Sequence, residues 1–462
     1  MLKRKVDLYL KKWLENRKQA LLITGARQIG KSFSMIKFIN ENFKNAIIVN
    51  FASLPKLVEN FAFFEEPNDL LTRLSLIAGD KLVPHETAIF FDEIQILYQK
   101  RDEKPDLKSK TIDLITAMKE LVTKGEYRFI LSGSLLGVTI KDITLMPVGY
   151  LDEYKMYPLD FEEFLWAKGV GEKTFQYVKK CFIDKTKVDE LVHQTLLKYF
   201  REYILIGGMP EAVETYINTS NLYLLKEVQD QIIGRYLADV VTYIKDENLK
   251  LRIKDIYKSI PSQLSSKNMR FISSQVIDNR YLKHNIINDE FLWLSASGLA
   301  ICVYNVDEPV IPLGLTKNRK ILKLFANDIG LFTAQLADTD IREKLLNNEK
   351  EINYGAPYEN AVAMELIAHG FDGEIYYYNS KKHGEVDFLI TYKNEVLPIE
   401  IKSGKNHDNV LYNHRALNNL IKMYDYSLAY VFGESNVTKE NDKIWQLPIY
   451  MIDFIRKNIP YS

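Results

Sequence analysis

The chain has 462 residues, 47% of them hydrophobic and 26% charged, a length that suggests roughly three domains at about 150 residues each. Its 61 basic and 61 acidic residues leave a formal net charge of zero, which excludes a global attraction to nucleic acid or anionic lipid. The two cysteines, Cys181 and Cys302, lack metal-ligand spacing and exclude a disulfide framework, so we predict a cytoplasmic protein. No run approaches the roughly 18 apolar residues that span a bilayer, and we predict no membrane contact.

The first motif, GARQIGKS, follows an apolar run at residues 20–24 and precedes a helical pattern. Strand, loop and helix in this order are the context of a P-loop. Glycines allow backbone N–H groups to wrap phosphates, while Lys31 reaches the outer phosphates and the Ser32 hydroxyl can ligate Mg²⁺. The sequence therefore predicts a site for ATP and Mg²⁺. Its predicted loop residues are Gly25, Ala26, Arg27, Gln28, Ile29, Gly30, Lys31 and Ser32.

A second apolar run, residues 88–91, ends in Asp92 and Glu93. Beside a P-loop, this pattern predicts that Asp92 holds the Mg²⁺ shell and that Glu93 deprotonates the attacking water. The alternative is an acidic pair that only caps the end of a strand. Ser132 or Ser134, after a third apolar run, could sense the terminal phosphate, as could Asn50; each could equally be an ordinary turn residue.

These motifs, with MYPLDFEEFLWAKG (156–169) and YILIGGMPEAV (203–213), resemble a prokaryotic family of AAA-type predicted ATPases. The resemblance implies an α/β chain with a P-loop ATPase domain built on a parallel sheet, a helical connector, a winged helix and a C-terminal domain like PD-(D/E)xK (restriction-endonuclease-like) nucleases. It also suggests a homo-oligomer. Many relatives carry a Gly-Arg pair where this chain reads LMPVGYLDEY, so the source of an arginine finger is open. The candidates are Arg27, Arg73, Arg128 and Arg235.

We expect four parts: the ATPase domain at 1–168, a helical lid or connector at 169–250, a winged-helix-like region at 251–330 and the nuclease-like domain at 331–462. The connector shows apolar residues at three- and four-residue spacing. The predicted recognition helix of the winged helix has only Arg280, Lys283 and His284 as basic residues. Packing against protein is therefore slightly favoured over DNA binding for this region.

The C-terminal part contains the strand-like runs GEVDFLITY and EVLPIEIKS, separated by Lys393 and Asn394. A two-residue turn there would place Asp387 opposite Glu400, and Glu385 opposite Lys402, on one face. Facing like charges destabilise a sheet unless a cation or a proton lies between them.

The hairpin is therefore predicted to be a metal-dependent nuclease site, in which Asp387 and Glu400 hold Mg²⁺, Lys402 orients water and Glu359 assists from a helix. The alternative is a Glu385–Lys402 salt bridge in a different register, with the acids solvated.

We predict a Mg²⁺-dependent, ATP-hydrolysing AAA-type ATPase coupled to a nuclease-like domain that binds DNA or RNA. A local basic rim for a phosphate backbone is formed by Lys381, Lys382, His383, Lys402 and Lys405. The alternative is a non-cutting, ATP-dependent regulator whose nuclease-like domain binds nucleic acid or a protein partner. A transposition or helicase-loader type of ATPase is a third possibility, and it does not need the Glu400-x-Lys402 pair.

Overall fold

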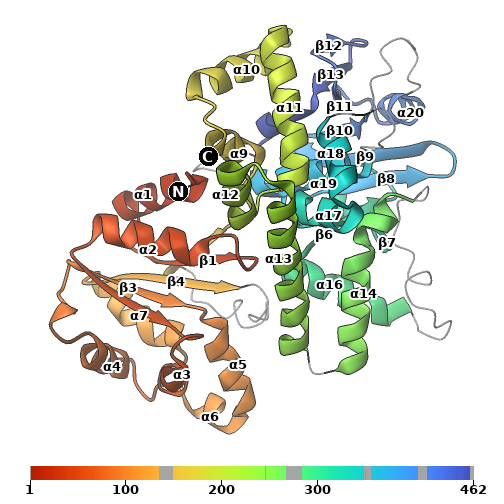
Figure 1. Cartoon of the computed structure of the whole chain (residues 1–462). Helices are drawn as coiled ribbons and strands as arrows, with labels where there is room; N and C mark the ends of the chain where they lie inside the picture. The colour runs from red at the N-terminus through yellow and green to blue at the C-terminus, as the bar shows by residue number, and fades with distance from the viewer. Residues whose placement is uncertain are drawn as a thin grey trace. The chain divides into compact units, whose positions relative to one another are not determined.

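The computed structural model describes residues 2–134, 149–244, 246–266, 284–347, 349, 355–403 and 414–457, without the side chains of 284–289 and 320. The chain forms two compact units, one mainly of Arg4–Tyr157 and one mainly of residues from Pro158 onward (Figure 1). Within these described ranges, no helix is both long enough and apolar enough to cross a bilayer.

The first unit is built on a sheet of five parallel strands in the order β2-β3-β4-β1-β5. The strands are β1 (Ala20–Gly25), β2 (Asn45–Asn50), β3 (Thr87–Asp92), β4 (Arg128–Ser134) and β5 (Leu151–Lys155). Both faces of β1 and β3 are buried, which explains their continuous apolar runs. Because the strands are parallel, the carboxyl ends of β1 to β4 meet at one edge, where ligands of such sheets bind.

Helices cover the two faces of this sheet, with α2 on one side and α7 on the other (Figure 1). The helices of the unit are α1 (Lys5–Asn16), α2 (Lys31–Asn42), α3 (Pro55–Ala62), α4 (Asn68–Ala78), η1 (Gly79–Lys81), α5 (Gln95–Glu103), α6 (Pro105–Lys110) and α7 (Leu114–Lys124). In the core, the Phe91 ring stacks on the rings of Phe51 and Phe129, with centroids 6.0 and 6.5 Å away. This aromatic packing holds β3, and with it Asp92, in place.

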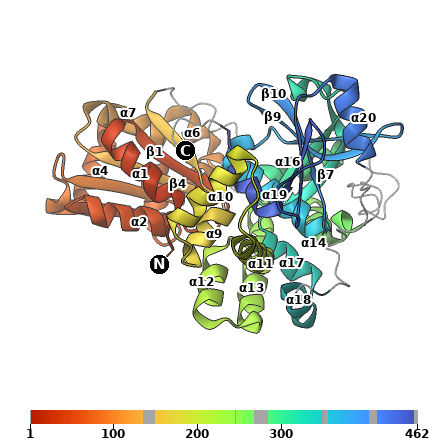
Figure 2. The same ribbon diagram turned by 90° about the horizontal axis from the view of Figure 1, so that it is seen from above.

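The second unit starts with helices, of which α13 and α14 run side by side (Figures 1 and 2). Its helices are α9 (Phe161–Ala167), α10 (Glu172–Asp184), α11 (Glu190–Ile206), α12 (Pro210–Thr219), α13 (Leu222–Tyr243), α14 (Glu247–Leu264), α16 (His284–Ala296), η2 (Leu313–Thr316), α17 (Ile329–Leu336), α18 (Thr339–Leu346), α19 (Gly355–Leu366), η3 (Ile367–Phe371), α20 (Arg415–Tyr424) and η4 (Ile449–Phe454).

The two sequence stretches that carried the family resemblance lie against each other in this unit. The Leu159 N–H donates to the Gly208 carbonyl at 2.7 Å, and the Tyr203 hydroxyl donates to the Leu159 carbonyl at 2.7 Å. A Cβ atom on Gly208 would lie 2.1 Å from that same Leu159 carbonyl oxygen. Glycine is therefore needed for this close backbone approach. Residues 158–168, which we expected to end the ATPase domain, belong to the second unit because they pack here.

The second unit also holds an eight-stranded mixed sheet in the order β12-β13-β11-β10-β9-β8-β6-β7. The strands are β6 (Ala300–Val306), β7 (Lys317–Ala326), β8 (Tyr376–Ser380), β9 (Gly384–Tyr392), β10 (Glu395–Ile401), β11 (Ala429–Gly433), β12 (Thr438–Lys439) and β13 (Ile444–Pro448). Strand β6 pairs with β8, Tyr304 facing Tyr376, and β7 pairs with β6.

The expected boundary at residue 330 therefore needs correction. Strands β6 and β7, assigned to the winged-helix-like region, are part of the C-terminal sheet. The apolar pattern of a strand indicates that it is a strand but not which strand it pairs with. The basic residues expected on a recognition helix, Arg280 and Lys283, lie outside the described residues, as does the side chain of His284.

Candidate active site and carboxylate cluster

The P-loop connects the end of β1 to the start of α2, as its sequence predicts. Gly25 and Gly30 have φ of 143° and 90°, and a Cβ atom on Gly25 would lie 2.3 Å from the Met156 carbonyl oxygen. The Lys31 ammonium is buried and donates to the carbonyls of Gly25 at 3.1 Å and Ala26 at 2.7 Å. Burial lowers the pKa of Lys31 to about 8, although the carboxylates of Glu93 and Asp92 raise it. The loop is thus closed around its own lysine.

A buried arginine anchors the loop from outside. Arg4, only 6% exposed, donates to the carbonyl of Ile29 at 2.9 Å and to that of Tyr157 at 2.7 Å. It therefore ties the middle of the P-loop to the chain that follows β5. Nothing in the basic opening of the sequence distinguishes Arg4 from its neighbours Lys3 and Lys5, so sequence reasoning missed it.

Asp92 lies at the carboxyl end of β3 and is oriented by both neighbouring strands. Its Oδ2 accepts a hydrogen bond from Asn50 Nδ2 at 2.8 Å, and its Oδ1 accepts one from the Ser132 hydroxyl. Asn50 and Ser132, which we expected to be phosphate sensors or turn residues, therefore hold the Asp92 carboxylate. Such support from neighbouring hydrogen bonds is typical of metal-ligating carboxylates.

Glu93 follows in a left-handed backbone conformation, with φ of 58°. Its Oε2 accepts a hydrogen bond from Gln95 Nε2 and lies 3.9 Å from a guanidinium nitrogen of Arg27. Gln95, which is fully buried, also accepts the Ser134 N–H on Oε1 at 3.2 Å. Gln95 thereby links Glu93 to the end of β4, a connection that no sequence motif indicated.

These residues fit Mg²⁺ and a nucleotide. Beside Met156, the loop has room only for a glycine at position 25. The Lys31 ammonium is bonded to loop carbonyls that phosphate oxygens can replace. Asp92 is held at the carboxyl edge of the sheet. Ser32 and Asp92 would hold Mg²⁺, which supplies neutralisation of phosphate charge. Of the arginine-finger candidates, Arg73 donates to the Phe63 carbonyl at 2.8 Å and Arg128 to the Arg17 carbonyl at 3.0 Å.

The C-terminal hairpin has the register expected from its turn. Lys393 and Asn394 both have positive φ, 50° and 66°, as a type I′ turn requires. Ile399 faces Phe388, so the following position on each strand brings Asp387 opposite Glu400. Asp387 Oδ2 accepts the Ile401 N–H at 2.8 Å, which fixes its carboxylate between the strands.

A lysine that the sequence did not single out lies among these acids. Lys323 of β7 is fully buried, and its ammonium is 2.7 Å from Glu385, 3.2 Å from Glu359 and 3.8 Å from Asp387. Burial lowers the pKa of Lys323, but the three carboxylates outweigh burial and raise it above its ordinary value. Lys323 is therefore a permanent cation at the centre of the cluster.

The other acid of the hairpin, Glu400, is also paired within the protein. Glu400 Oε1 is paired with the Lys402 ammonium, and Glu400 Oε2 lies 3.3 Å from His414 Nδ1. Burial raises the pKa of Glu400, but the bonds to His414 and Lys402 lower it overall. Burial and the charge of Glu359 raise the pKa of Asp387 to about 8. Glu385, expected opposite Lys402, is bonded to Lys323 and Asn379 instead.

These contacts fit a Mg²⁺ site poorly. Glu359 and Asp387, the carboxylates expected to take the metal, face the Lys323 ammonium, while Glu400 faces Lys402 and His414. A divalent ion between Asp387 and Glu359 would have to share the space with a buried cation, which is unfavourable in a low-dielectric interior. We therefore derive no metal-dependent step at this hairpin.

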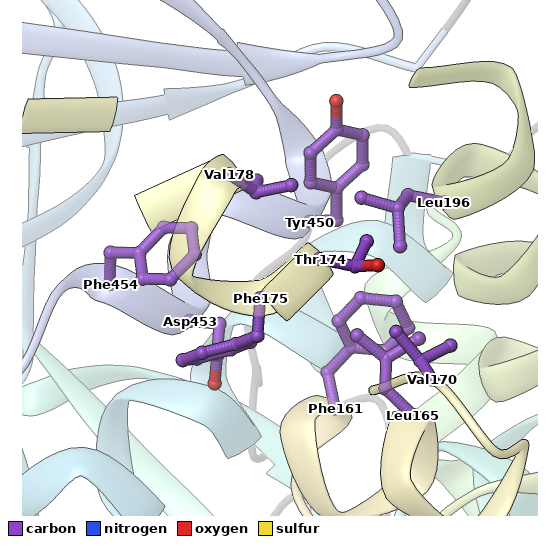
Figure 3. A pocket seen from close by; sticks show the side chains of 10 residues that line it. All are labelled: Phe161, Leu165, Val170, Thr174, Phe175, Val178, Leu196, Tyr450, Asp453 and Phe454. Carbon is purple, nitrogen blue, oxygen red and sulfur yellow. The ribbon is translucent and has the colours of Figure 1, made fainter. Parts of the chain in front are cut away.

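The second unit also contains an apolar pocket (Figure 3). Asp453 is the one charged residue among the ten that line it. The lining residues are Phe161, Leu165, Val170, Thr174, Phe175, Val178, Leu196, Tyr450, Asp453 and Phe454.

Three family models match the chain: an AAA domain over residues 17–165, and two domains of unknown function, DUF8612 over residues 197–342 and DUF4143 over residues 354–452. An uncharacterized protein of Methanocaldococcus jannaschii is 26% identical over 380 residues, covering 81% of this chain and 73% of that protein. An uncharacterized protein of Haemophilus influenzae is 24% identical over 450 residues, covering 94% of this chain and 93% of the relative.

Among solved structures, the Walker-type ATPase PABY2304 of Pyrococcus abyssi is 15% identical with a TM-score of 0.45, and the match covers 73% of this chain and 96% of that one. AMPPCP-bound DnaA from Aquifex aeolicus is 14% identical with a TM-score of 0.28, covering 78% of this chain and 92% of that one. With the matched AAA model and the P-loop geometry, the N-terminal part of the chain is an AAA-type P-loop ATPase domain.

Proposed function

We propose that the chain is a Mg²⁺-dependent ATPase whose C-terminal domain has a nuclease-like arrangement but binds nucleic acid without cutting it. The observation that carries the non-cutting part is the buried Lys323 ammonium, which lies between the carboxylates that a nuclease would use for its metal. The proposed chemistry is therefore confined to the P-loop domain, and the C-terminal domain serves as its binding module.

At the P-loop, phosphate oxygens replace the Gly25 and Ala26 carbonyls as partners of the Lys31 ammonium. Ser32 and Asp92 would hold Mg²⁺, with Asp92 kept in position by Asn50. The carboxylate of Glu93 takes a proton from the attacking water once it is released from Gln95.

Measurement of ATP turnover in the Lys31→Ala and Glu93→Gln variants tests the proposed ATPase activity. Lys31→Ala should lose nucleotide binding and turnover together, while Glu93→Gln should bind ATP normally and hydrolyse it about 10²–10⁴-fold more slowly. Lys44→Ala is the matched control, because Lys44 is an exposed lysine of the same domain that pairs with Glu86. Full turnover in Lys31→Ala would refute the assignment.

Incubation with supercoiled plasmid in Mg²⁺ and in Mn²⁺, with and without ATP, tests the proposal that the C-terminal domain binds DNA without cutting it. The wild-type chain should bind the DNA and leave it uncut. Nicking that disappears in an Asp387→Ala/Lys402→Ala variant would overturn the non-cutting proposal and restore the metal site predicted from the sequence.

The nucleic-acid partner is proposed from two exposed lysines, Lys381 and Lys382, which lie in the turn before β9. Lys402 directly follows β10, the second strand of the hairpin. A Lys381→Glu/Lys382→Glu variant should bind DNA at least tenfold more weakly, while Lys439→Glu, an exposed lysine on β12 paired with Asp442, should not. If the wild-type chain binds neither DNA nor RNA, this part of the proposal fails, whereas the ATPase assignment stands.

A further inference from the structure

Four side chains from three separate segments converge inside the second unit. They are Asp160 before α9, Glu365 on α19, His369 on the π-helical turn η3, and Asp453 on η4. Asp160, His369 and Asp453 each place one ligand atom within 4.8 Å of the others, and all three are buried. Glu365 is fully buried as well.

The distances from His369 to the three carboxylates match the spacing of ligands around one metal ion. His369 Nε2 lies 3.3 Å from Asp453 Oδ1, 3.5 Å from Glu365 Oε2 and 3.6 Å from Asp160 Oδ2. Hydrogen bonds between such atoms are about 2.7–3.2 Å long. Ligand atoms at about 2.0–2.2 Å from a tetrahedral Zn²⁺ are separated from one another by about 3.3–3.6 Å. The three contacts thus have the length of tetrahedron edges.

The histidine itself points to a ligand. His369 is 4% exposed, and neither of its ring nitrogens makes a hydrogen bond to any residue that the structure describes. A proton on Nε2 can be directed at one acceptor, whereas three carboxylate oxygens surround this atom. A cation placed between the ring nitrogen and the carboxylate oxygens of Asp160 and Asp453 would interact with all three.

The surrounding residues orient the carboxylates in the way that supporting residues do around metal ligands. Asp160 Oδ1 accepts the Glu163 N–H at 2.9 Å, and Glu365 Oε1 accepts the Phe161 N–H at 2.9 Å, so the second oxygen of each is the one turned toward His369. Asp453 Oδ1 accepts from the Arg456 guanidinium at 2.9 Å. Asp453 also lines the apolar pocket of Figure 3.

We propose that Asp160, His369 and Asp453 form a Zn²⁺ site, with Glu365 beside it. One imidazole nitrogen and two carboxylate oxygens are ligands that Zn²⁺ accepts, and a ligand from outside the chain would complete a tetrahedron. The ion would join the residue before α9 to η3 and η4, which are far apart in sequence. This site is independent of the proposed ATPase and nucleic-acid functions.

Metal analysis of the full chain tests the proposal. The protein is stripped with EDTA, dialysed against Zn²⁺ and then against metal-free buffer, and its zinc is measured by mass spectrometry. The wild type should retain about one equivalent, and H369Q and D453N less than about one tenth of that. The matched control is H193Q, which alters a buried histidine that is fully hydrogen-bonded to Tyr450 and to the Glu434 carbonyl, and it should keep the zinc.

A second measurement does not depend on the variants folding. The wild-type chain loaded with Co²⁺ should show the intense visible absorption of a tetrahedral site without a thiolate charge-transfer band, which excludes Cys181 and Cys302 as ligands. Equal zinc in the wild type and H369Q, or a weak octahedral Co²⁺ spectrum, would overturn the proposal. The cluster would then be a buried histidinium held by carboxylates.

Discussion

Replacement of Lys323 by methionine should turn the compensated carboxylate cluster into a divalent-cation site. Lys323 is fully buried and faces Glu359, Glu385 and Asp387 at 3.2, 2.7 and 3.8 Å. Removing one partner of a buried ion pair costs about 3–5 kcal/mol, because the remaining charge stays buried without compensation. For a large domain this corresponds to a fall in Tm on the order of 10 °C. Met has nearly the length of the lysine stem, so packing changes little.

Thermal unfolding of the full chain, with and without Mn²⁺, measures both effects. In Lys323→Met, Mn²⁺ should restore much of the lost stability, because the ion can take the position of the ammonium; the wild type should not respond at this site. Lys402→Met is the matched control: that lysine is 36% exposed, so its loss should change stability by under about 1 kcal/mol. An unchanged Tm in Lys323→Met, or a lowered Tm that Mn²⁺ does not raise, would refute the reasoning.

Three further predictions concern single residues. Gly208→Ala should destabilise the protein by roughly 1–3 kcal/mol in urea denaturation, because its Cβ would lie 2.1 Å from the Leu159 oxygen, whereas Gly234→Ala, with open space, should not. Burial raises the pKa of Asp328 from 3.8 to about 6, so its contribution to stability is present at low pH and lost as pH rises through 6. Asp328→Asn should therefore gain about 3 kcal/mol relative to the wild type between about pH 4 and pH 7; a pH-independent difference would contradict this. Arg4→Ala should weaken ATP binding several-fold in a nucleotide titration, and unchanged affinity would remove Arg4 from the support of the P-loop.

Local signals made the P-loop predictable. The Gly25 to Ser32 spacing specifies one strand, one turn and one helix, and all three are adjacent in the chain. The Asp387–Glu400 register was equally local, because a two-residue turn with positive φ at Lys393 and Asn394 determines every pair along the hairpin.

Contacts between distant segments could not be read from the sequence in the same way. Lys323 lies 36 residues from Glu359, and its own stretch, ILKLFA, is an apolar run with one lysine, which does not indicate the carboxylates that this lysine meets. Strands β6 and β7 were assigned to a separate region because an apolar pattern does not name a pairing partner. His369 lies in η3, directly after the apolar helix α19, and nothing in that stretch indicates a ligand. Only the folded chain brings Asp160 and Asp453 to it.

The pairing of β6 with β8 has a practical consequence for work with isolated fragments. A fragment beginning at residue 331, the domain boundary expected from the sequence, would contain Glu359, Asp387 and Glu400 but neither Lys323 nor strand β6, which covers the edge of β8. Such an exposed edge invites association with other chains. Its carboxylates would also lack their internal counter-ion, so metal uptake or DNA cleavage observed with that fragment would report an artificial site and not a property of the intact protein.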